Sequence, residues 1–508
     1  MSKTLATCTV LSLSLILFGI NRGFDISDEG LYMLLANPDQ ENIAGIFNYD
    51  LFFKLFYKLI GIEFGIVGMR FLRLLSCLIG AISLTIFWRN LNGANKLSVN
   101  LFLLSLLGLF AGYGFLPQSL SYNSLTVVLA CFWLALISLH DKSHIQYMLI
   151  GVLLACVAYT KITTTFGLGI ITLACMLFQK DFKWVNLLAL LLPFVMLELL
   201  MYLSIGDFAL WRMIDAGKMM GNRTEYSFLL VVKYSAVGFF WLALTSIPFL
   251  ISSSIDASQA KLKFSMLGLG LLGLVCISYY TAITQDWNHI VLLLTAAFFG
   301  YFLPKVPFKA ISLEQRFFLL VLLILPFVLH FGSNVYWLRL SIHYWVFWML
   351  AILYVANSIQ APFMKLIRAV MGLVILLVVA NGIWIHPFEQ EPLWQATQKW
   401  SYGDGNQILL SEQQVVVLSA IEPFVKDQEQ LLAFYRIPGI PYLLGKTSPR
   451  SAGFWTKDQT EYFFPSDYPT ELLIYYSQDS LPSFVKGDFS KKHIQLPFGE
   501  EIQILWRK

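Results

Sequence analysis

Three carboxylates lie within five residues near the start of the chain: Asp25, Asp28 and Glu29. They follow the apolar segment Leu5–Ile20, and most of the next 360 residues are apolar as well. Acids at a membrane surface are costly to desolvate, so such a cluster indicates that the carboxylates contact solvent, a ligand or a metal ion. Any of the three could act as a catalytic acid or base, taking the proton of an attacking hydroxyl group. Solvated loop acids or a helix cap are the plainer readings, because Ser27 with the two acids after it is typical of a helix start.

Basic residues form the second set of candidates. Arg70 and Arg73 lie near one end of the apolar segment 65–88, and Arg339 precedes another such segment. Lys161 separates two apolar segments with almost no loop between them, so it must lie near membrane depth. Together these groups could bind a phosphate, arginine through two parallel hydrogen bonds and lysine as a point charge. Each could also be a simple headgroup anchor at the bilayer edge.

Three polar residues are weaker candidates for contacting a substrate. Tyr122 and Asn123 end a short loop and could bond to hydroxyl groups of a ligand, although ordinary turn residues would look the same. His343 lies near the start of a late apolar segment. Glu198 lies inside an apolar segment, where we expect it to pair with a cation.

The elements that must position these residues are membrane helices. Of the 508 residues, 57% are hydrophobic and 13% are charged, and the mean hydropathy is +0.67. Soluble domains contain about a quarter charged residues, so we predict a polytopic α-helical membrane protein. We expect about 13 crossings, in the apolar segments 5–20, 65–88, 97–116, 123–139, 145–160, 163–178, 185–203, 228–252, 264–282, 289–303, 317–331, 341–357 and 367–385.

The positions of Lys and Arg orient these crossings. With the N-terminus in the cytoplasm, every cytoplasmic connection contains Lys or Arg: 89–96, 140–144, 180–183, 256–263, 305–316 and 360–365. This is the positive-inside pattern. The carboxylate cluster and everything after residue 386 then lie on the outer side. Because no cysteine lies in that outer region, we favour a bacterial inner membrane with a periplasmic C-terminal domain.

The chain is therefore divided into a transmembrane domain, residues 1–386, and a small α/β domain, residues 387–508. Juxtamembrane helices are predicted in the outer loops 21–64 and 204–227, where aromatic and basic residues alternate. Within the C-terminal domain, a helix is expected over Glu422–Phe434, and strands are expected over Gln414–Leu418, Glu471–Tyr476 and Ile502–Trp506.

Composition also argues against several partners. The net charge of +4 reflects loop lysines. The sequence has no basic stripe of the kind that would predict binding of nucleic acid. All six cysteines fall in apolar segments, where cysteine behaves as a small buried hydrophobe. No Cys/His spacing predicts a metal site.

The chain resembles the GT-C superfamily of membrane glycosyltransferases, in the branch with protein O-mannosyltransferases and lipid A aminoarabinose transferases. The resemblance covers most of the chain as topology, and its short motifs agree in order and in side of the membrane. The motifs are Asp28-Glu29 followed by Gly30-Leu31-Tyr32, the arginine-led Arg73 to Gly80, Thr160-Lys161, and Pro441 to Arg450.

The resemblance implies that Asp28 is the catalytic base toward the acceptor and that Arg73 and Lys161 bind the donor phosphate. It implies a polyprenyl-phosphate sugar donor, inversion at the anomeric carbon and no required cofactor, although some relatives carry a metal ion. The acceptor stays open between a glycan, a lipid and a protein, with membrane lipids as surroundings. The chain departs from the family at Asn48 to Asp50, which makes Asp50 a second candidate acid for substrate binding.

The main alternative is a polytopic transporter or flippase of lipid-linked sugars. Such a protein would show repeated halves and interrupted helices with charges near the bilayer midplane. The sequence shows no evident repeat, and an outer domain of about 120 residues is unusual for that class.

Overall fold

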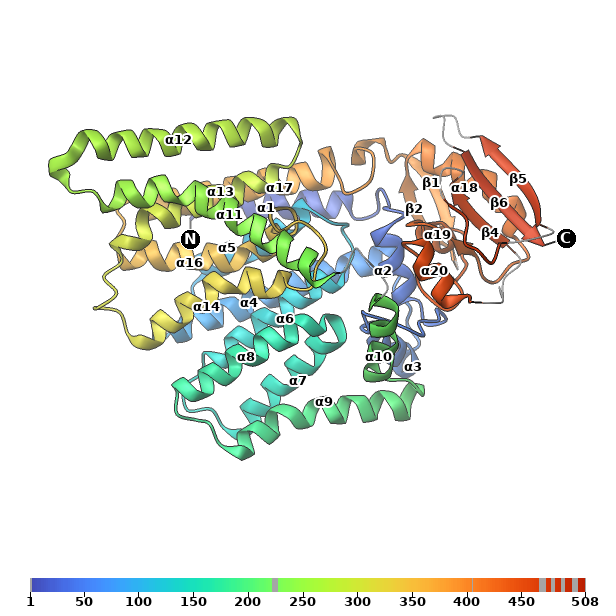
Figure 1. Ribbon diagram of the computed structural model, residues 1–508, viewed down its shortest axis with the longest axis horizontal. Coiled ribbons are helices and arrows are strands. Elements are labelled where there is room, and N and C mark those ends of the chain that lie inside the picture. Colours follow the sequence, from blue (N-terminus) through green and yellow to red (C-terminus); the bar gives the residue numbers. More distant parts are fainter. Residues whose placement is uncertain are drawn as a thin grey trace.

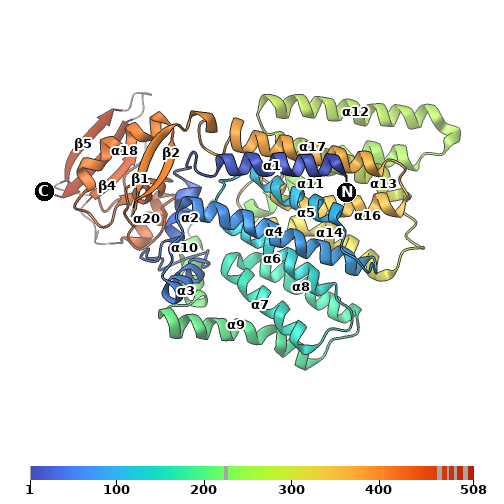
Figure 2. The ribbon, with the colours of Figure 1, turned by 180° about the vertical axis from the view of Figure 1, so that it is seen from behind.

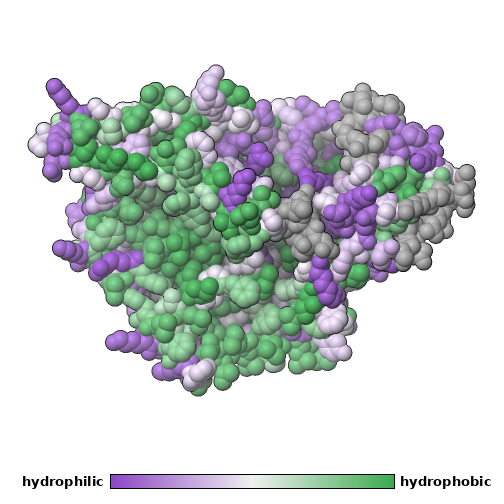
Figure 3. Space-filling model, viewed as in Figure 1, coloured by the Kyte–Doolittle hydropathy of each residue, from purple (hydrophilic) through white to green (hydrophobic). Residues whose placement is uncertain are grey.

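The computed structural model describes residues 2–221, 227–403, 405–465, 472–476, 480–485, 489–495 and 501–507. Long helices run side by side through most of the molecule, and a small unit of strands and short helices lies at one end of them (Figure 1). Hydrophobic residues cover much of the helical part, whereas hydrophilic residues gather on the strand-containing unit and at the opposite helix ends (Figure 3). This division is typical of a membrane-embedded part joined to an aqueous one.

Among the described residues, eight helical spans are long and apolar enough to cross a membrane, and five shorter apolar helices accompany them. The eight spans contain α4 (Ile66–Leu91), α9 (Trp184–Ile205), α11 (Phe228–Ser254), α12 (Ala260–Ile283), α13 (Trp287–Phe302), α14 (Leu313–His330), α16 (Trp345–Ser358) and α17 (Met364–Ala380). The shorter helices are α1 (Lys3–Gly19), α5 (Val99–Phe110), α6 (Tyr122–Ile137), α7 (His144–Thr160) and α8 (Ile162–Phe178). They coincide with the segments predicted from the sequence, and the crossing of the membrane by all thirteen stays a prediction.

The bundle has a centre and a rim. In the most apolar stretch of the span that contains α16, 94% of the residues are buried inside the protein. The corresponding share for the span of α12 is only 11%, and this helix lies at the edge of the bundle (Figure 1). A helix that is apolar all round must be covered by protein or by lipid. α16 is therefore the core helix of the bundle, and α12 depends on lipid.

The connection between α5 and α6 is an irregular segment buried near the end of the bundle. A 3₁₀ turn, Ala111–Gly114, leads into the non-helical residues 115–121, most of which are buried. Irregular backbone at this depth requires protein or a polar cavity around it, because its carbonyl and N–H groups need partners. Further short turns lie at α15 (Trp337–Leu340), Ser341–Tyr344, Asn381–Ile385, Ala257–Gln259, Leu303–Lys305 and Leu393–Gln395.

The described residues of the C-terminal unit form two small sheets. An antiparallel hairpin of β1 (Gln398–Tyr402) and β2 (Asn406–Leu410) forms the first. The second has the order β3-β4-β6-β5, with β3 parallel to β4 and the other pairs antiparallel. Its strands are β3 (Leu432–Ala433), β4 (Leu472–Tyr476), β5 (Phe489–Gln495) and β6 (Glu501–Arg507), accompanied by α18 (Glu412–Val425), α19 (Gly439–Leu443) and α20 (Lys457–Phe463).

Two predictions for this unit are confirmed and two are wrong. β4 and β6 lie where strands were expected, although Glu471 itself lies outside the described residues. The expected strand Gln414–Leu418 is instead part of α18, and the expected helix over 422–434 covers only the last turn of α18. A capping box starts α18, since Ser411 and Gln414 each accept a hydrogen bond from the other's backbone N–H. The run of valines in α18 misled the strand prediction.

The loop after α1 packs directly on the C-terminal unit and shares one hydrophobic cluster with it. This loop contains α2 (Asp28–Ala36) and α3 (Asp50–Ile60), and α10 (Ala209–Gly221) lies beside α3 (Figure 2). The backbones of α2 and α19 meet closely at Gly30 and Gly439: a Cβ built on Gly30 would lie 2.2 Å from the Gly439 nitrogen. The start of α2 is thus held between the helix bundle and the C-terminal unit.

Candidate functional site

The start of α2 is built around the carboxylate of Asp25, which is fully buried. It accepts hydrogen bonds from the backbone N–H groups of Ser27 (2.8 Å) and Glu29 (3.0 Å). The first N–H groups of a helix have no partner inside the helix, so an acid here satisfies them and suits the helix dipole. Of the two predictions made for Asp25, catalytic acid and helix cap, these contacts fit the cap.

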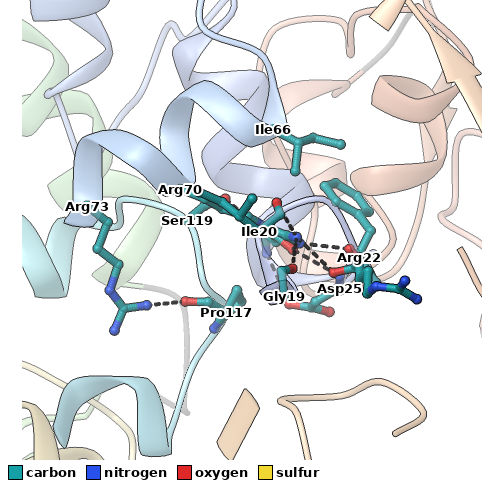
Figure 4. Close-up of polar contacts among 12 residues, drawn as sticks. Gly19, Ile20, Arg22, Asp25, Ile66, Arg70, Arg73, Pro117 and Ser119 are labelled. Atoms are coloured by element: carbon teal, nitrogen blue, oxygen red, sulfur yellow. Dashed lines mark hydrogen bonds and ion pairs between the residues drawn. The ribbon is translucent and has the colours of Figure 1, made fainter. Parts of the chain in front are cut away.

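Glu29 forms a buried ion pair with Arg70 of α4. Arg70 donates from Nε to Oε1 and from Nη2 to Oε2, both at 2.8 Å, and Ser119 donates to the same carboxylate. The other Arg70 N–H contacts go to backbone carbonyls at the end of α1 and just beyond, those of Gly19 (3.5 Å), Ile20 (3.1 Å), Arg22 (2.8 Å) and Gly23 (2.7 Å) (Figure 4). Glu29 was predicted as catalytic and Arg70 as phosphate-binding. They occupy each other's hydrogen-bonding groups and so hold the start of α2 against α4, and their predicted roles in catalysis and phosphate binding stay predictions.

Asp28, in the first turn of α2, differs from its two neighbours. Its side chain is partly buried, and among the described residues no hydrogen bond or ion pair is made by its carboxylate. Burial raises the pKa of Asp28 to about 7, with the charge of Glu389 adding to the rise and that of Arg436 opposing it. A carboxylate with a pKa near neutrality and no fixed partner can exchange a proton with a bound group.

Tyrosines surround this carboxylate. Burial raises the pKa of both Tyr32 and Tyr49, and the charge of Asp28 raises each further. The Tyr32 and Tyr122 rings meet edge to face with centroids 6.1 Å apart, and Phe47 stacks on Tyr122 at 3.8 Å. The Tyr49 hydroxyl is buried and has no hydrogen-bond partner in the described chain. The site therefore offers apolar ring faces together with hydroxyl groups.

Arg73 lies one turn after Arg70 on α4 and is equally buried, with 1% of its surface exposed. It donates to the carbonyl of Pro117 in the irregular segment (Figure 4). Its guanidinium lies 3.9 Å from the centroid of the Tyr113 ring. No carboxylate pairs with Arg73 in the ranges that the structure describes. A buried charge without a counter-ion is costly, which makes Arg73 the strongest candidate for an anionic ligand.

Several polar atoms close to Arg73 are also unsatisfied. A Cβ built on Gly112 would lie 3.3 Å from Arg73 Nη2 and 2.8 Å from His343 Nδ1, so both side chains lie against this glycine. His343 Nε2, the Tyr113 hydroxyl and both amide atoms of Gln118 are buried with no partner among the described residues. Buried polar groups are normally hydrogen-bonded, so this group is suited to a ligand or to water.

Contacts connect the Asp28 region to the Arg73 region. Tyr122 lies against Tyr32 at one end, and the neighbouring Asn123 accepts a hydrogen bond of 3.4 Å from the Tyr344 hydroxyl. The Tyr344 ring lies 6.4 Å from the ring of His343, which lies beside Arg73. Four residues predicted from the sequence, Tyr122, Asn123, His343 and Arg73, are thus brought into one connected set with Asp28.

Two predicted phosphate-binding residues are engaged elsewhere. The Lys161 ammonium donates to the carbonyls of Leu329 and, at 3.3 Å, His330, which end α14. It therefore caps that helix, as a cation suits a helix C-terminus. Arg339 lies half exposed in an ion pair with Asp286, with Nε 3.2 Å from Oδ1. In the structure both residues make contacts within the protein, and their predicted role in binding phosphate stays a prediction.

Asp50 joins the two juxtamembrane helices. Arg212 of α10 donates two hydrogen bonds to its carboxylate, at 2.9 and 2.7 Å, and Lys54 lies 3.6 Å away. Arg212 also pairs with Asp207 at 2.8 Å. Asp50 and Arg212 are buried and hold α3 against α10, and the predicted contact of Asp50 with substrate stays a prediction.

Sequence reasoning missed Glu389 and Arg436, and it assigned no role in the site to Tyr32 or Tyr49. The first two come from the linker and from the C-terminal unit, hundreds of residues from Asp28, and no motif marks them. In the described part of the chain, no three His, Cys, Asp or Glu side chains are grouped to hold a metal ion. Whether the site works without metal stays a prediction.

No protein-family model matches the chain, and no curated protein matches its sequence. The resemblance to the GT-C superfamily is therefore carried by the residues themselves and stays an expectation. The fold and site define a helical membrane protein with an adjoining C-terminal unit, an acid of raised pKa at their junction and a buried arginine that lacks a counter-ion among the described residues.

Proposed function

We propose that the protein is a GT-C-type glycosyltransferase that moves a sugar from a polyprenyl-phosphate donor to an acceptor hydroxyl. The observation that carries the proposal is the pairing state of Asp28. Its two acidic neighbours are used to build the start of α2, whereas Asp28 is left with no fixed partner in the described chain and a pKa of about 7. Such a group is suited to act as a general base at neutral pH.

In the proposed reaction, Asp28 takes the proton of the acceptor hydroxyl as the acceptor oxygen forms a bond to the anomeric carbon. The bond from that carbon to the phosphate oxygen breaks, and its electron pair leaves with the phosphate. Arg73 stabilises the charge of the leaving phosphate, which supplies the counter-ion that this arginine lacks in the described protein. Attack from the face opposite the phosphate inverts the anomeric centre.

The surrounding contacts support this arrangement. Asp25 caps α2, the Glu29–Arg70 pair fixes its first turn to α4, and Gly30 packs on Gly439. Together they hold Asp28 in place, as a positioned base requires. Tyr32 and Tyr49 offer ring faces and hydroxyl groups that suit a sugar.

The finer localisation is part of the same proposal. We infer thirteen crossings of a bacterial inner membrane, a cytoplasmic N-terminus and a periplasmic C-terminal unit, on the basis of the positive-inside pattern. A lipid-linked donor reaches such a site from the bilayer. The acceptor, a cell-envelope glycan, a lipid or a protein, approaches from the side of the C-terminal unit.

The test measures sugar transfer from a panel of polyprenyl-phosphate sugars by the full-length protein in membranes. Asp28→Asn is expected to lower turnover by about 10²–10⁴-fold, the usual contribution of a general base. Asp39→Asn is the matched control, because Asp39 is an exposed acid just after α2. Equal turnover by both variants would rule out Asp28 as the base. If the native protein consumes no donor but moves lipid-linked sugar across vesicles, the transporter alternative replaces the proposal.

A further inference from the structure

A small cavity lined by both polar and apolar side chains lies at the end of the bundle away from α2 and the C-terminal unit. Its volume is about 70 Å³, enough for several water-sized groups. Four helix ends meet there: the last turns of α4 and α16 and the first turns of α5 and α17. The lining residues are Trp88, Ser98, Asn100, Leu101, Leu104, Leu353, Asn357, Met364 and Arg368.

Arg368 lies on the side of α17 that faces protein. The residues of α17 that are buried lie three, four and seven positions after it, at Met371, Gly372 and Ile375. The lipid-exposed side of the helix instead carries Leu366 and Val370. An arginine that merely anchors a helix in headgroups extends from the lipid-exposed side. Arg368 faces its neighbours, and its Nε is buried without a hydrogen-bond partner in the described chain.

The helices around the cavity supply no counter-ion for this arginine. Residues 2–24, 64–140 and 315–388, which contain α1, α4, α5, α16 and α17, include no Asp or Glu. Glu314, at the same end of the bundle, is paired with His140 at 2.8 Å. An anion that balances Arg368 must therefore come from outside these segments.

Other groups at the cavity also favour an anion. α5 begins here, with Ser98 as its cap, and a helix N-terminus attracts negative charge through its free N–H groups. Asn100 uses its Oδ1 to accept a hydrogen bond of 2.9 Å from the Ser2 backbone, which leaves its amide nitrogen as a donor. Asn357 adds a second side-chain amide to the lining. The Arg368 guanidinium, the N–H groups at the start of α5 and the two side-chain amides are all hydrogen-bond donors, which suits the oxygen atoms of a phosphate.

We propose that this cavity binds the headgroup phosphate of an anionic phospholipid from the adjacent leaflet. The lipid source is favoured over free phosphate because Leu97 and Val99, on either side of the lining residue Ser98, are apolar and 50% and 57% exposed. They offer acyl chains a surface beside the charged group. Trp88 is suited to the level of the membrane interface. The site is separate from Asp28 and does not depend on the proposed transfer reaction.

The test measures binding of phosphatidylglycerol to the delipidated full-length protein by native mass spectrometry. Arg368→Gln is expected to weaken binding about tenfold, the loss of one charge-assisted contact of ordinary strength. The matched control is Lys365→Gln, because Lys365 is an exposed cation one turn earlier on α17. A second variant, Asn357→Leu, keeps the charge and removes a lining amide, so it is expected to weaken binding several-fold.

Each of the following three outcomes would overturn the proposal. Equal binding by Arg368→Gln and Lys365→Gln would mean that any cation at this end suffices. Phosphatidylcholine binding as tightly as phosphatidylglycerol would exclude recognition of an anionic headgroup. Displacement of the lipid by millimolar inorganic phosphate would assign the cavity to a soluble anion. Elution of each variant as a monodisperse peak in size-exclusion chromatography ensures that binding is compared between folded proteins.

Discussion

Arg70 and Arg73 lie one turn apart on α4 and are equally buried, yet their surroundings are opposite. Arg70 has a carboxylate partner and several backbone carbonyls, so its charge is balanced and its N–H groups are occupied. Arg73 has one carbonyl, an aromatic ring and no carboxylate in the described chain. Burial of a charge is tolerated when it is paired. The difference separates an arginine that holds the fold together from one that is available to a ligand.

The acids of α2 divide in the same way. Glu29 pairs with Arg70, whereas Asp28, its neighbour in sequence, has no fixed partner in the described residues. Sequence adjacency therefore says little about role, because successive residues of a helix point about 100° apart. We expect the paired set to be structural and the unpaired set to be reactive.

The largest effect is expected for Glu29→Gln, which leaves the Arg70 charge buried and unbalanced. Breaking a buried ion pair from one side costs about 3–5 kcal/mol. We expect a marked fall in the apparent melting temperature of the purified protein, measured by heating followed by size-exclusion chromatography. Asp28→Asn serves as the control and should not lower it. A melting temperature unchanged in Glu29→Gln would mean that the pair does not stabilise the junction.

Arg73→Gln should give the next largest effect, and on turnover rather than on stability. Removing a cation that stabilises a leaving phosphate costs on the order of 10²-fold in rate. Arg73→Lys keeps the charge but not the planar geometry and should recover part of the loss. The measurement is initial rate against donor concentration at saturating acceptor. If Arg73→Gln unfolds the protein while Arg73→Lys is fully active and stable, Arg73 is a structural cation like Arg70.

A smaller effect is expected in the pH dependence of turnover, which should follow the protonation of Asp28. Below pH 7 the carboxyl is protonated and cannot act as a base, so turnover should fall about tenfold for each pH unit. Because the folded-state pKa is raised above the ordinary value of 3.8, the contribution of Asp28 to stability is lost as pH rises from about 4 to about 7.

Asp28→Asn removes this titration, so its melting temperature should fall less than that of the native protein between pH 5 and pH 8. Thermal unfolding of both proteins at the two pH values checks this. A turnover profile that is flat from pH 5 to pH 8 would contradict the role of Asp28 as the base.

Much of this arrangement was accessible from the sequence, for reasons of chemistry. Apolar segments long enough for a bilayer predict helices because backbone groups in lipid must be paired within the segment. A serine followed by two acids predicts a helix start, and α2 begins at Asp28. The pairing of Glu29 with Arg70, 41 residues away, has no local signal, nor has the approach of Arg436 to Asp28.

Lys161 shows the limit of the argument from depth. An ionisable residue near membrane depth was a reasonable candidate for phosphate, but carbonyls at the end of α14 satisfy it. The sequence shows that an ionisable group at membrane depth needs a partner. It does not show whether that partner is a ligand or another part of the protein. The same limit explains why α18 was misread, since its valines suit a strand and only the cap and the tertiary packing select a helix.

The smallest effect is expected for Arg339→Gln, which tests whether a paired arginine that is exposed to solvent also has only a structural role. Arg339 pairs with Asp286, but about half of the Arg339 side chain is exposed, and exposed ion pairs contribute about 0–1 kcal/mol. We therefore expect turnover within about twofold of the native value and a nearly unchanged melting temperature. A tenfold fall in turnover with normal stability would mean that Arg339 leaves Asp286 to bind the donor. The reactive set would then extend beyond the buried residues, and lack of a partner would no longer be the criterion that identifies it.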